Sequence, residues 1–106
     1  MLIKPGVKIV GIKVETLLAI QVAQSIYIEA GFELVVNSLL DGTHMQNSLH
    51  YKGLAVDLRV PSKCRRLKPT SLLDWEAKNA IKQALGSSYN VILELEDHIH
   101  IEFDPK

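Results

Sequence analysis

Residues 48 to 57, with the sequence Ser-Leu-His-Tyr-Lys-Gly-Leu-Ala-Val-Asp, constrain this chain more than any other segment. The segment starts in a predicted loop and enters a predicted strand over residues 53–60. Alternation along a strand places Gly53, Ala55 and Asp57 on one face. The opposite face is apolar and consists of Leu54, Val56, Leu58 and Val60. Because small residues flank the carboxylate, this face has room for an ion and a substrate. The pattern therefore predicts a functional site on a strand.

A second segment near the end of the chain, Asp97-His98-Ile99-His100, carries the same residue types. A histidine near an aspartate is often an ordinary hydrogen-bonded pair. Imidazole and carboxylate are also ligands that suit zinc, and catalytic zinc sites use three protein ligands and keep one position open. Because the two segments lie far apart in the sequence, the residues alone leave both interpretations open.

The first segment resembles S-x-H-x-x-G-x-A-x-D, the signature of the zinc D-Ala-D-Ala peptidases, at all five fixed positions. That family includes the VanX and VanY types and the phage L-alanyl-D-glutamate endolysins, and it is related to the lysostaphin and hedgehog folds. Its second motif is an acid three residues before a histidine, which Asp97 and His100 match. The resemblance covers residues 15 to 103 of the chain.

The resemblance implies that His50, Asp57 and His100 bind Zn²⁺ and that Asp97 is the catalytic acid and base. It also implies an α+β fold of the hedgehog/DD-peptidase type, with two helices packed on an antiparallel sheet. The expected reaction is hydrolysis of a D-Ala-D-Ala or L-Ala-D-Glu bond in the stem peptide of bacterial peptidoglycan. The expected setting is a phage lysis enzyme or tail component.

The chain departs from the family pattern at two positions. Family members place an arginine near the start of the loop over residues 38–49, where this chain has Ser-Leu-Leu-Asp. We expect His44 to replace that arginine as a hydrogen-bond donor to the substrate carbonyl, with Arg59 or a backbone N–H as the next candidate. The acid is aspartate, whereas most relatives have glutamate. These departures favour an alternative, a metal-stabilised binding domain that has lost activity.

Other residues near the two motifs keep open roles. His98 shares a strand face with His100, so it could be the third zinc ligand instead of His100. Otherwise it is a contact to substrate or to a ligand, or a surface residue. Ser48 is expected to support the ligands by hydrogen bonding. Glu94 and Glu96 are alternative bases to Asp97.

Local patterns predict helices over residues 16–30 and 71–85 and strands over residues 7–9, 12–14, 33–37, 53–60, 91–95 and 98–103. Thr16 is the expected cap of the first helix, and Ser71 with Asp74 has the spacing of a capping box for the second. The succession of elements indicates an α+β fold.

Composition bounds the remaining possibilities. A chain of 106 residues with 47% hydrophobic content is expected to form one domain, residues 1–106. The net charge is zero, which gives no indication of a nucleic acid partner. The single cysteine, Cys64, cannot form an intrachain disulfide. Without a signal peptide or a membrane span, we expect a monomer that is cytoplasmic as synthesised, does not insert into membranes and reaches the wall after release or in a phage particle.

Overall fold

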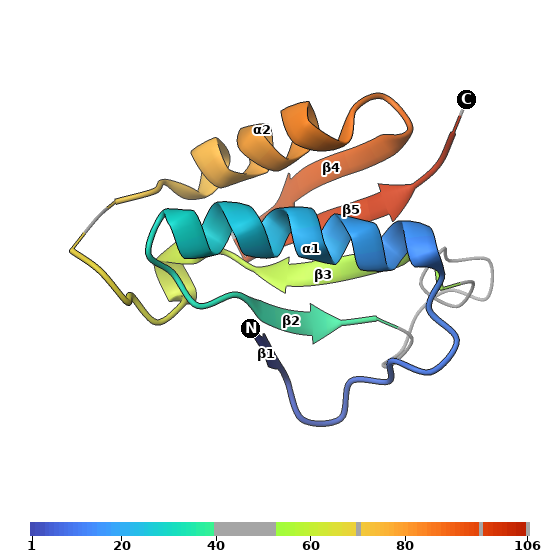
Figure 1. Cartoon of the computed structure of the whole chain (residues 1–106), viewed down its shortest axis with the longest axis horizontal. Helices are drawn as coiled ribbons and strands as arrows, with labels where there is room; N and C mark the ends of the chain where they lie inside the picture. The colour runs from blue at the N-terminus through green and yellow to red at the C-terminus, as the bar shows by residue number, and fades with distance from the viewer. Residues whose placement is uncertain (40–52, 70, 96, 106) are drawn as a thin grey trace.

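The computed structural model describes residues 1–39, 53–69, 71–95 and 97–105. Two helices, a short 3₁₀ turn and five strands make up the described elements (Figure 1). The helices are α1 (Val14–Glu29) and α2 (Asp74–Leu85), and the 3₁₀ turn is η1 (Pro61–Lys63). The strands are β1 (Leu2–Ile3), β2 (Val35–Ser38), β3 (Ala55–Arg59), β4 (Tyr89–Glu94) and β5 (His98–Phe103).

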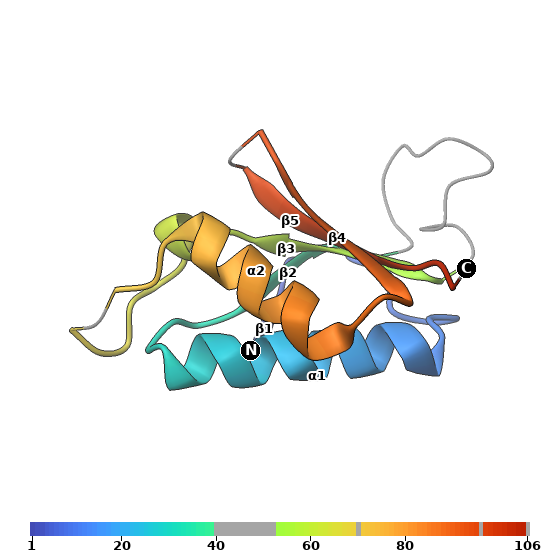
Figure 2. The same ribbon diagram turned by 90° about the horizontal axis from the view of Figure 1, so that it is seen from above.

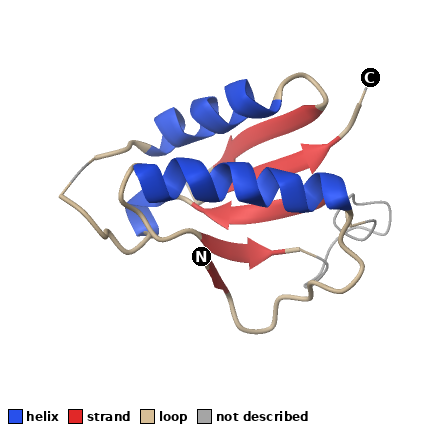
Figure 3. Ribbon diagram, viewed as in Figure 1, coloured by secondary structure: helices blue, strands red, loops and turns tan. Residues whose placement is uncertain are grey.

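The strands form one sheet in the order β1-β2-β3-β5-β4, and both helices lie on the same side of it (Figures 2 and 3). The α+β prediction is confirmed, but the prediction of an antiparallel sheet is wrong, because β1 pairs with β2 in parallel. The backbone N–H of Leu2 donates to the carbonyl of Leu34 at 2.8 Å, and that of Lys4 donates to Val36 at 3.0 Å. Helix α1 connects β1 to β2 and carries the chain back along the length of the sheet. Strand β2 therefore starts at the same end of the sheet as β1 and runs in the same direction. Such a helical crossover is what parallel pairing requires.

The two short strands predicted at residues 7–9 and 12–14 do not form. Gly6 and Gly11 both have a φ of 91°, so the chain turns twice in this region instead of extending. The backbone N–H of Lys13 then donates to the carbonyl of Gly53 at 3.0 Å. This hydrogen bond joins the start of α1 to the segment that enters β3.

Helix α1 begins two residues earlier than predicted, at Val14, so Thr16 lies inside the helix and does not cap it. The buried hydroxyl of Thr16 instead donates to the carbonyl of Gly53 at 2.7 Å. The side of α1 that faces the sheet buries two alanines, an isoleucine and a tyrosine: Ala19, Ile20, Ala23 and Tyr27. Two hydrogen bonds, from Thr16 and Lys13, thus fix the helix against the start of β3.

Helix α2 begins at Asp74, three residues later than predicted, and Leu73 occupies the N-cap position. The carboxylate of Glu76 accepts a hydrogen bond from the backbone N–H of Leu73 at 3.0 Å. Asp74 accepts from the backbone N–H and the hydroxyl of Ser62, at 2.9 and 2.7 Å. The expected box of Ser71 and Asp74 is therefore wrong, because the carboxylate of Asp74 anchors η1 to α2 instead.

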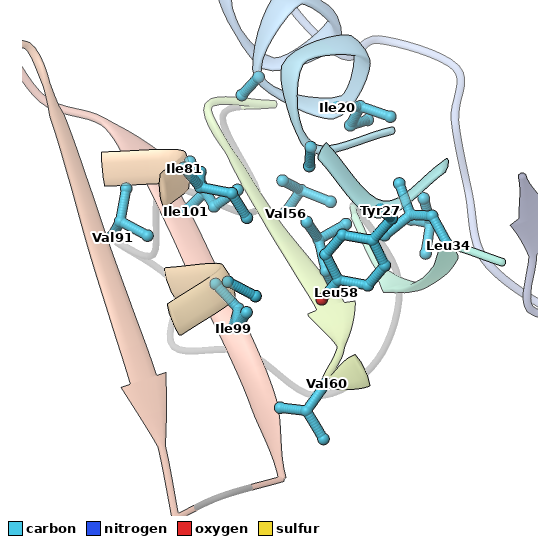
Figure 4. Packing of buried hydrophobic residues seen from close by; sticks show 14 of the residues in the cluster. Ile20, Tyr27, Leu34, Val56, Leu58, Val60, Ile81, Val91, Ile99 and Ile101 are labelled. Atoms are coloured by element: carbon cyan, nitrogen blue, oxygen red, sulfur yellow. The ribbon is translucent and has the colours of Figure 1, made fainter. Parts of the chain in front are cut away.

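The core lies between the helices and the sheet (Figure 4). Its fully buried members from the two central strands are Val56, Leu58, Ile99 and Ile101. These residues confirm the predicted alternation, since Asp57, His98 and His100 are interleaved with them and face the other side of the sheet. The hydroxyl of buried Tyr27 donates to the carbonyl of Arg59 at 2.8 Å and ties α1 to the end of β3.

None of the helices in the described ranges combines the length and the apolar character needed to cross a membrane.

Candidate functional site

The antiparallel pairing of β3 with β5 brings the two sequence motifs together. Asp57 is the register partner of His100, and Arg59 is the register partner of His98. Residues that are directly opposite on antiparallel strands have side chains on the same face. The predicted ligands Asp57 and His100, 43 positions apart in the chain, therefore meet on the face that the helices leave uncovered.

The Asp57–His100 pair is the most tightly connected part of this face. The Nδ1 atom of His100 lies 2.8 Å from Oδ1 of Asp57, and the two side chains are 16% and 15% exposed. Burial lowers the pKa of His100, but the hydrogen bond and the charge of Asp57, with the charges of Glu102 and Glu94, outweigh burial and raise the pKa overall. The Nε2 atom of His100 lies 3.9 Å from Oε2 of Glu102 on the same strand.

His98 lies between this pair and the acids of the β4–β5 hairpin. Its Nε2 atom is 3.1 Å from Oε2 of Glu94 and 3.8 Å from Oδ1 of Asp57. Its Nδ1 atom is 3.3 Å from Oδ2 of Asp97. Glu94 is the register partner of His98 on β4, which places the alternative base beside the predicted site. These contacts do not select among the roles that the sequence leaves open for His98.

Asp97, the predicted acid and base, lies in the turn between β4 and β5. Its backbone N–H donates to the carbonyl of Glu94 at 2.9 Å and closes the turn. Its carboxylate accepts a hydrogen bond from Nζ of Lys63 at 2.7 Å. Hydrogen bonds from Lys63 and from His98, with the lysine charge, lower the pKa of Asp97. Asp97 is therefore a carboxylate at neutral pH, the form in which it accepts a proton.

Lys63, which contacts Asp97, was not among the site residues predicted from the sequence. It follows β3 by four positions and ends η1, whereas its partner Asp97 lies 34 positions further along the chain. A possible signal was its position in the connection that follows the strand carrying Asp57. That signal is weak, because Lys63, Arg65, Arg66 and Lys68 form a basic run in which no member stands out.

The glycine of the first motif has a structural explanation. Gly53 has a φ of 74°, and a Cβ atom built on it would lie 2.5 Å from the carbonyl oxygen of Gly11. Its own carbonyl accepts the hydrogen bonds from Lys13 and Thr16. Only glycine combines this backbone conformation with so close an approach, so Gly53 sets the position at which the chain enters β3.

Cys64 has no features of a catalytic nucleophile. Burial raises the pKa of its thiol to about 11, although Arg59 and a backbone hydrogen bond act in the opposite direction. The thiol is therefore protonated at neutral pH, and the thiolate is the reactive form of cysteine.

Several predicted site residues lie outside the described residues, namely His44, Ser48, His50 and Glu96. Within residues 1–39, 53–69, 71–95 and 97–105, no three His, Cys, Asp or Glu side chains form a group that could hold a metal ion. A three-ligand site that includes Asp57 and His100 therefore needs a ligand from outside these ranges, and His50 is the one that the sequence predicts. The nitrogen and oxygen donors of the Asp57–His100 pair fit zinc in their chemistry.

Comparison of the chain with protein-family models gives no match, and comparisons with curated proteins and with solved structures give none either.

Proposed function

We propose that this protein is a zinc peptidase that cuts a D-Ala-D-Ala or L-Ala-D-Glu bond in the stem peptide of bacterial peptidoglycan. The observation that carries the proposal is the register pairing of Asp57 with His100, which joins the two motifs on one sheet face. The proposal extends to a hedgehog/DD-peptidase type of fold and to a phage lysis enzyme or tail component as the setting. The helix-free face supports it, since an extended peptide needs an uncovered surface beside the ligands.

In this proposal His50, Asp57 and His100 hold the zinc ion. Bound zinc supplies two kinds of chemistry: it lowers the pKa of a water molecule, and it polarises the scissile carbonyl. Asp97 takes the proton of the attacking water on its carboxylate and passes a proton to the nitrogen of the leaving amine. The lowered pKa of Asp97 keeps it ionised for the first step, at the cost of making it a weaker base.

His98 has one of two roles in this proposal. Its contacts with Asp97, Glu94 and Asp57 suit a residue that orients the acid next to the ligands. In the other role, His98 binds zinc together with Asp57 in place of His100, and its contact with Asp57 supports this role. Glu94 is the alternative base, because its carboxylate faces the same imidazole.

His44 is proposed to donate a hydrogen bond to the carbonyl oxygen as negative charge develops there, with Arg59 as the next candidate. Losing such a donor typically lowers kcat by about 10²–10³-fold. We expect His44→Ala to keep its zinc and to lower kcat more than it raises KM. A His44→Ala protein that matches the wild type from pH 5 to 9 would assign the donor role elsewhere.

Metal analysis tests the ligands. Zinc content is measured after dialysis for the wild type and for His50→Ala, His98→Ala and His100→Ala. The wild type should hold one zinc per chain, and the variants of His50 and His100 should lose it. Full zinc content in both of these variants contradicts the proposed ligands. If His98→Ala loses its zinc and His100→Ala keeps it, the third ligand is His98 and not His100.

Hydrolysis of defined muropeptides, followed by mass spectrometry, tests the activity and identifies the bond that is cut. Zinc-loaded wild type should release product, and a chelator should abolish the reaction. Asp97→Asn should keep zinc and lose activity by about 10²–10⁴-fold, because its amide cannot accept the proton. Near-normal turnover by this variant would assign the acid–base role to Glu94 or Glu96.

The second candidate function is a zinc-binding domain without catalytic activity. The ion pair with Lys63 favours it, since the lowered pKa of Asp97 weakens that residue as a base. A zinc-loaded wild type that binds purified peptidoglycan and releases no product from it would support this candidate over the peptidase.

A further inference from the structure

We infer that Lys63 is a positioning residue that holds Asp97 in its reactive orientation at the tip of the β4–β5 hairpin. The inference rests on the proposed function, in which Asp97 is the acid and base. Its central observation is the contact between Nζ of Lys63 and Oδ1 of Asp97, at 2.7 Å.

The backbone of Lys63 is anchored in three ways. The preceding residues Val60 and Pro61 are buried. The backbone N–H of Lys63 donates to the carbonyl of Val60 at 3.0 Å, which closes η1. Ser62 donates twice to the carboxylate of Asp74 at the start of α2. The lysine side chain therefore extends from a backbone that is fixed to both the sheet and a helix.

Asp97 has much less support from its own surroundings. Its side chain is 61% exposed. It follows Leu95 by two positions, and Leu95 has a φ of 51°, which is unfavourable for a leucine. With Oδ1 near Lys63 and Oδ2 3.3 Å from Nδ1 of His98, both carboxylate oxygens are engaged. A partner at each oxygen favours one rotamer of so short a side chain over the others.

Stability does not explain the ion pair. The side chain of Lys63 is 54% exposed and that of Asp97 is 61% exposed. Exposed ion pairs contribute little to the free energy of unfolding, because water and salt screen the charges and two flexible side chains must be ordered. The pair does join the connection after β3, which carries Asp57, to the turn before β5, which carries His100. Its effect is therefore on the relative placement of Asp97 and the two ligand strands.

The test compares Lys63→Met, which keeps an unbranched side chain close to lysine in length but removes the ammonium group, with Lys63→Arg and with Lys78→Met. Lys78 lies on α2, which packs on the side of the sheet opposite to Asp57 and His100, and it controls for the loss of a lysine. Lys63→Met should keep the zinc content and melting temperature of the wild type. Its kcat on a muropeptide should fall by about 10–100-fold, the size of effect that a small misplacement of a reacting group produces. KM should stay within about twofold, Lys63→Arg should recover most of the rate, and Lys78→Met should match the wild type.

A double-mutant cycle with Asp97→Asn decides whether Lys63 acts through Asp97. If it does, Lys63→Met has no further effect on kcat once Asp97 is replaced. A full additional loss in the double variant means that Lys63 acts on the substrate directly, and this overturns the inference. So does a wild-type kcat in Lys63→Met, or a rate that Lys63→Arg does not recover.

The same experiment separates failure of this inference from failure of the proposed function. If zinc-loaded wild type releases no product from muropeptides, the proposed function fails and the role of Lys63 fails with it. If the wild type is active and Lys63→Met is equally active, only the inference fails.

Discussion

At the scale of single residues, the site is a series of contacts between acidic side chains and their lysine or histidine partners. Lys63 contacts Asp97, Asp97 contacts His98, and His98 faces both Glu94 and Asp57. Contacts of this kind can change the pKa of a carboxyl group. Asp97 offers the clearest case, because a hydrogen bond from Lys63 is the largest influence on its pKa.

We predict that Lys63→Met raises the pKa of Asp97 towards the ordinary value of an aspartate. The sign follows from the cause, because the substitution removes the hydrogen bond and the positive charge of Lys63, and both of them lower the pKa of Asp97. NMR titration of the Asp97 carboxyl carbon in the zinc-free protein measures the shift. Lys78→Met is the control and should leave the pKa of Asp97 where it is in the wild type. An equal pKa in Lys63→Met and wild type would contradict the assignment of Lys63 as the cause.

At the scale of elements, Gly53 determines how the first motif enters β3. Its carbonyl receives the hydroxyl of Thr16 and the N–H of Lys13, and its Cα faces the backbone of Gly11. Gly6 is a matched comparison, since it also has a positive φ, of 91°, but has no atom within 4 Å of a Cβ built on it.

We predict that Gly53→Ala destabilises the protein more than Gly6→Ala does. The left-handed backbone conformation costs an alanine about 1–2 kcal/mol at either position. At Gly53 the contact with the carbonyl of Gly11 adds to this cost, so we expect a total of about 2–4 kcal/mol. Urea unfolding of the zinc-free proteins measures both free energies. Equal destabilisation by the two substitutions would mean that the segment around Gly11 moves aside without cost.

At the scale of the whole molecule, the predicted zinc site joins segments that are distant in sequence. A ligand that binds only the folded state stabilises it, by about 2.7 kcal/mol at a concentration of 100 times Kd. For a domain of this size, that corresponds to a rise in Tm of about 10–20 °C. We therefore predict that saturating zinc raises Tm by this amount in the wild type and that a chelator reverses the rise.

The same measurement on His100→Ala provides the control, because removal of one ligand should abolish most of the increase in Tm. Magnesium at the same concentration should have little effect, since it prefers oxygen ligands to imidazole. A wild-type Tm that does not respond to zinc would contradict the metal site.

The sequence by itself determined the features that depend on neighbouring residues. The alternation of Val56 and Leu58 with Asp57, and of Ile99 and Ile101 with His98 and His100, correctly assigned one face of each strand to the core. Both helices and the β4–β5 hairpin were also predicted from local patterns, with boundaries displaced by a few residues. These predictions succeed because side-chain periodicity is a property of the chain segment itself.

Only the tertiary structure decided which segments meet. Strand periodicity assigns a face to Asp57 and to His100, but their contact depends on the register between β3 and β5. The parallel pairing of β1, the hydrogen bond of Asp74 with Ser62 and the contact of Lys63 with Asp97 likewise depend on partners that are remote in the chain. Thr16 illustrates the difference: its residue type indicated a helix cap, whereas the nearby carbonyl of Gly53 made it a link between α1 and the entry to β3. Local pattern fixes the direction in which a side chain points, and long-range packing fixes the group that it contacts.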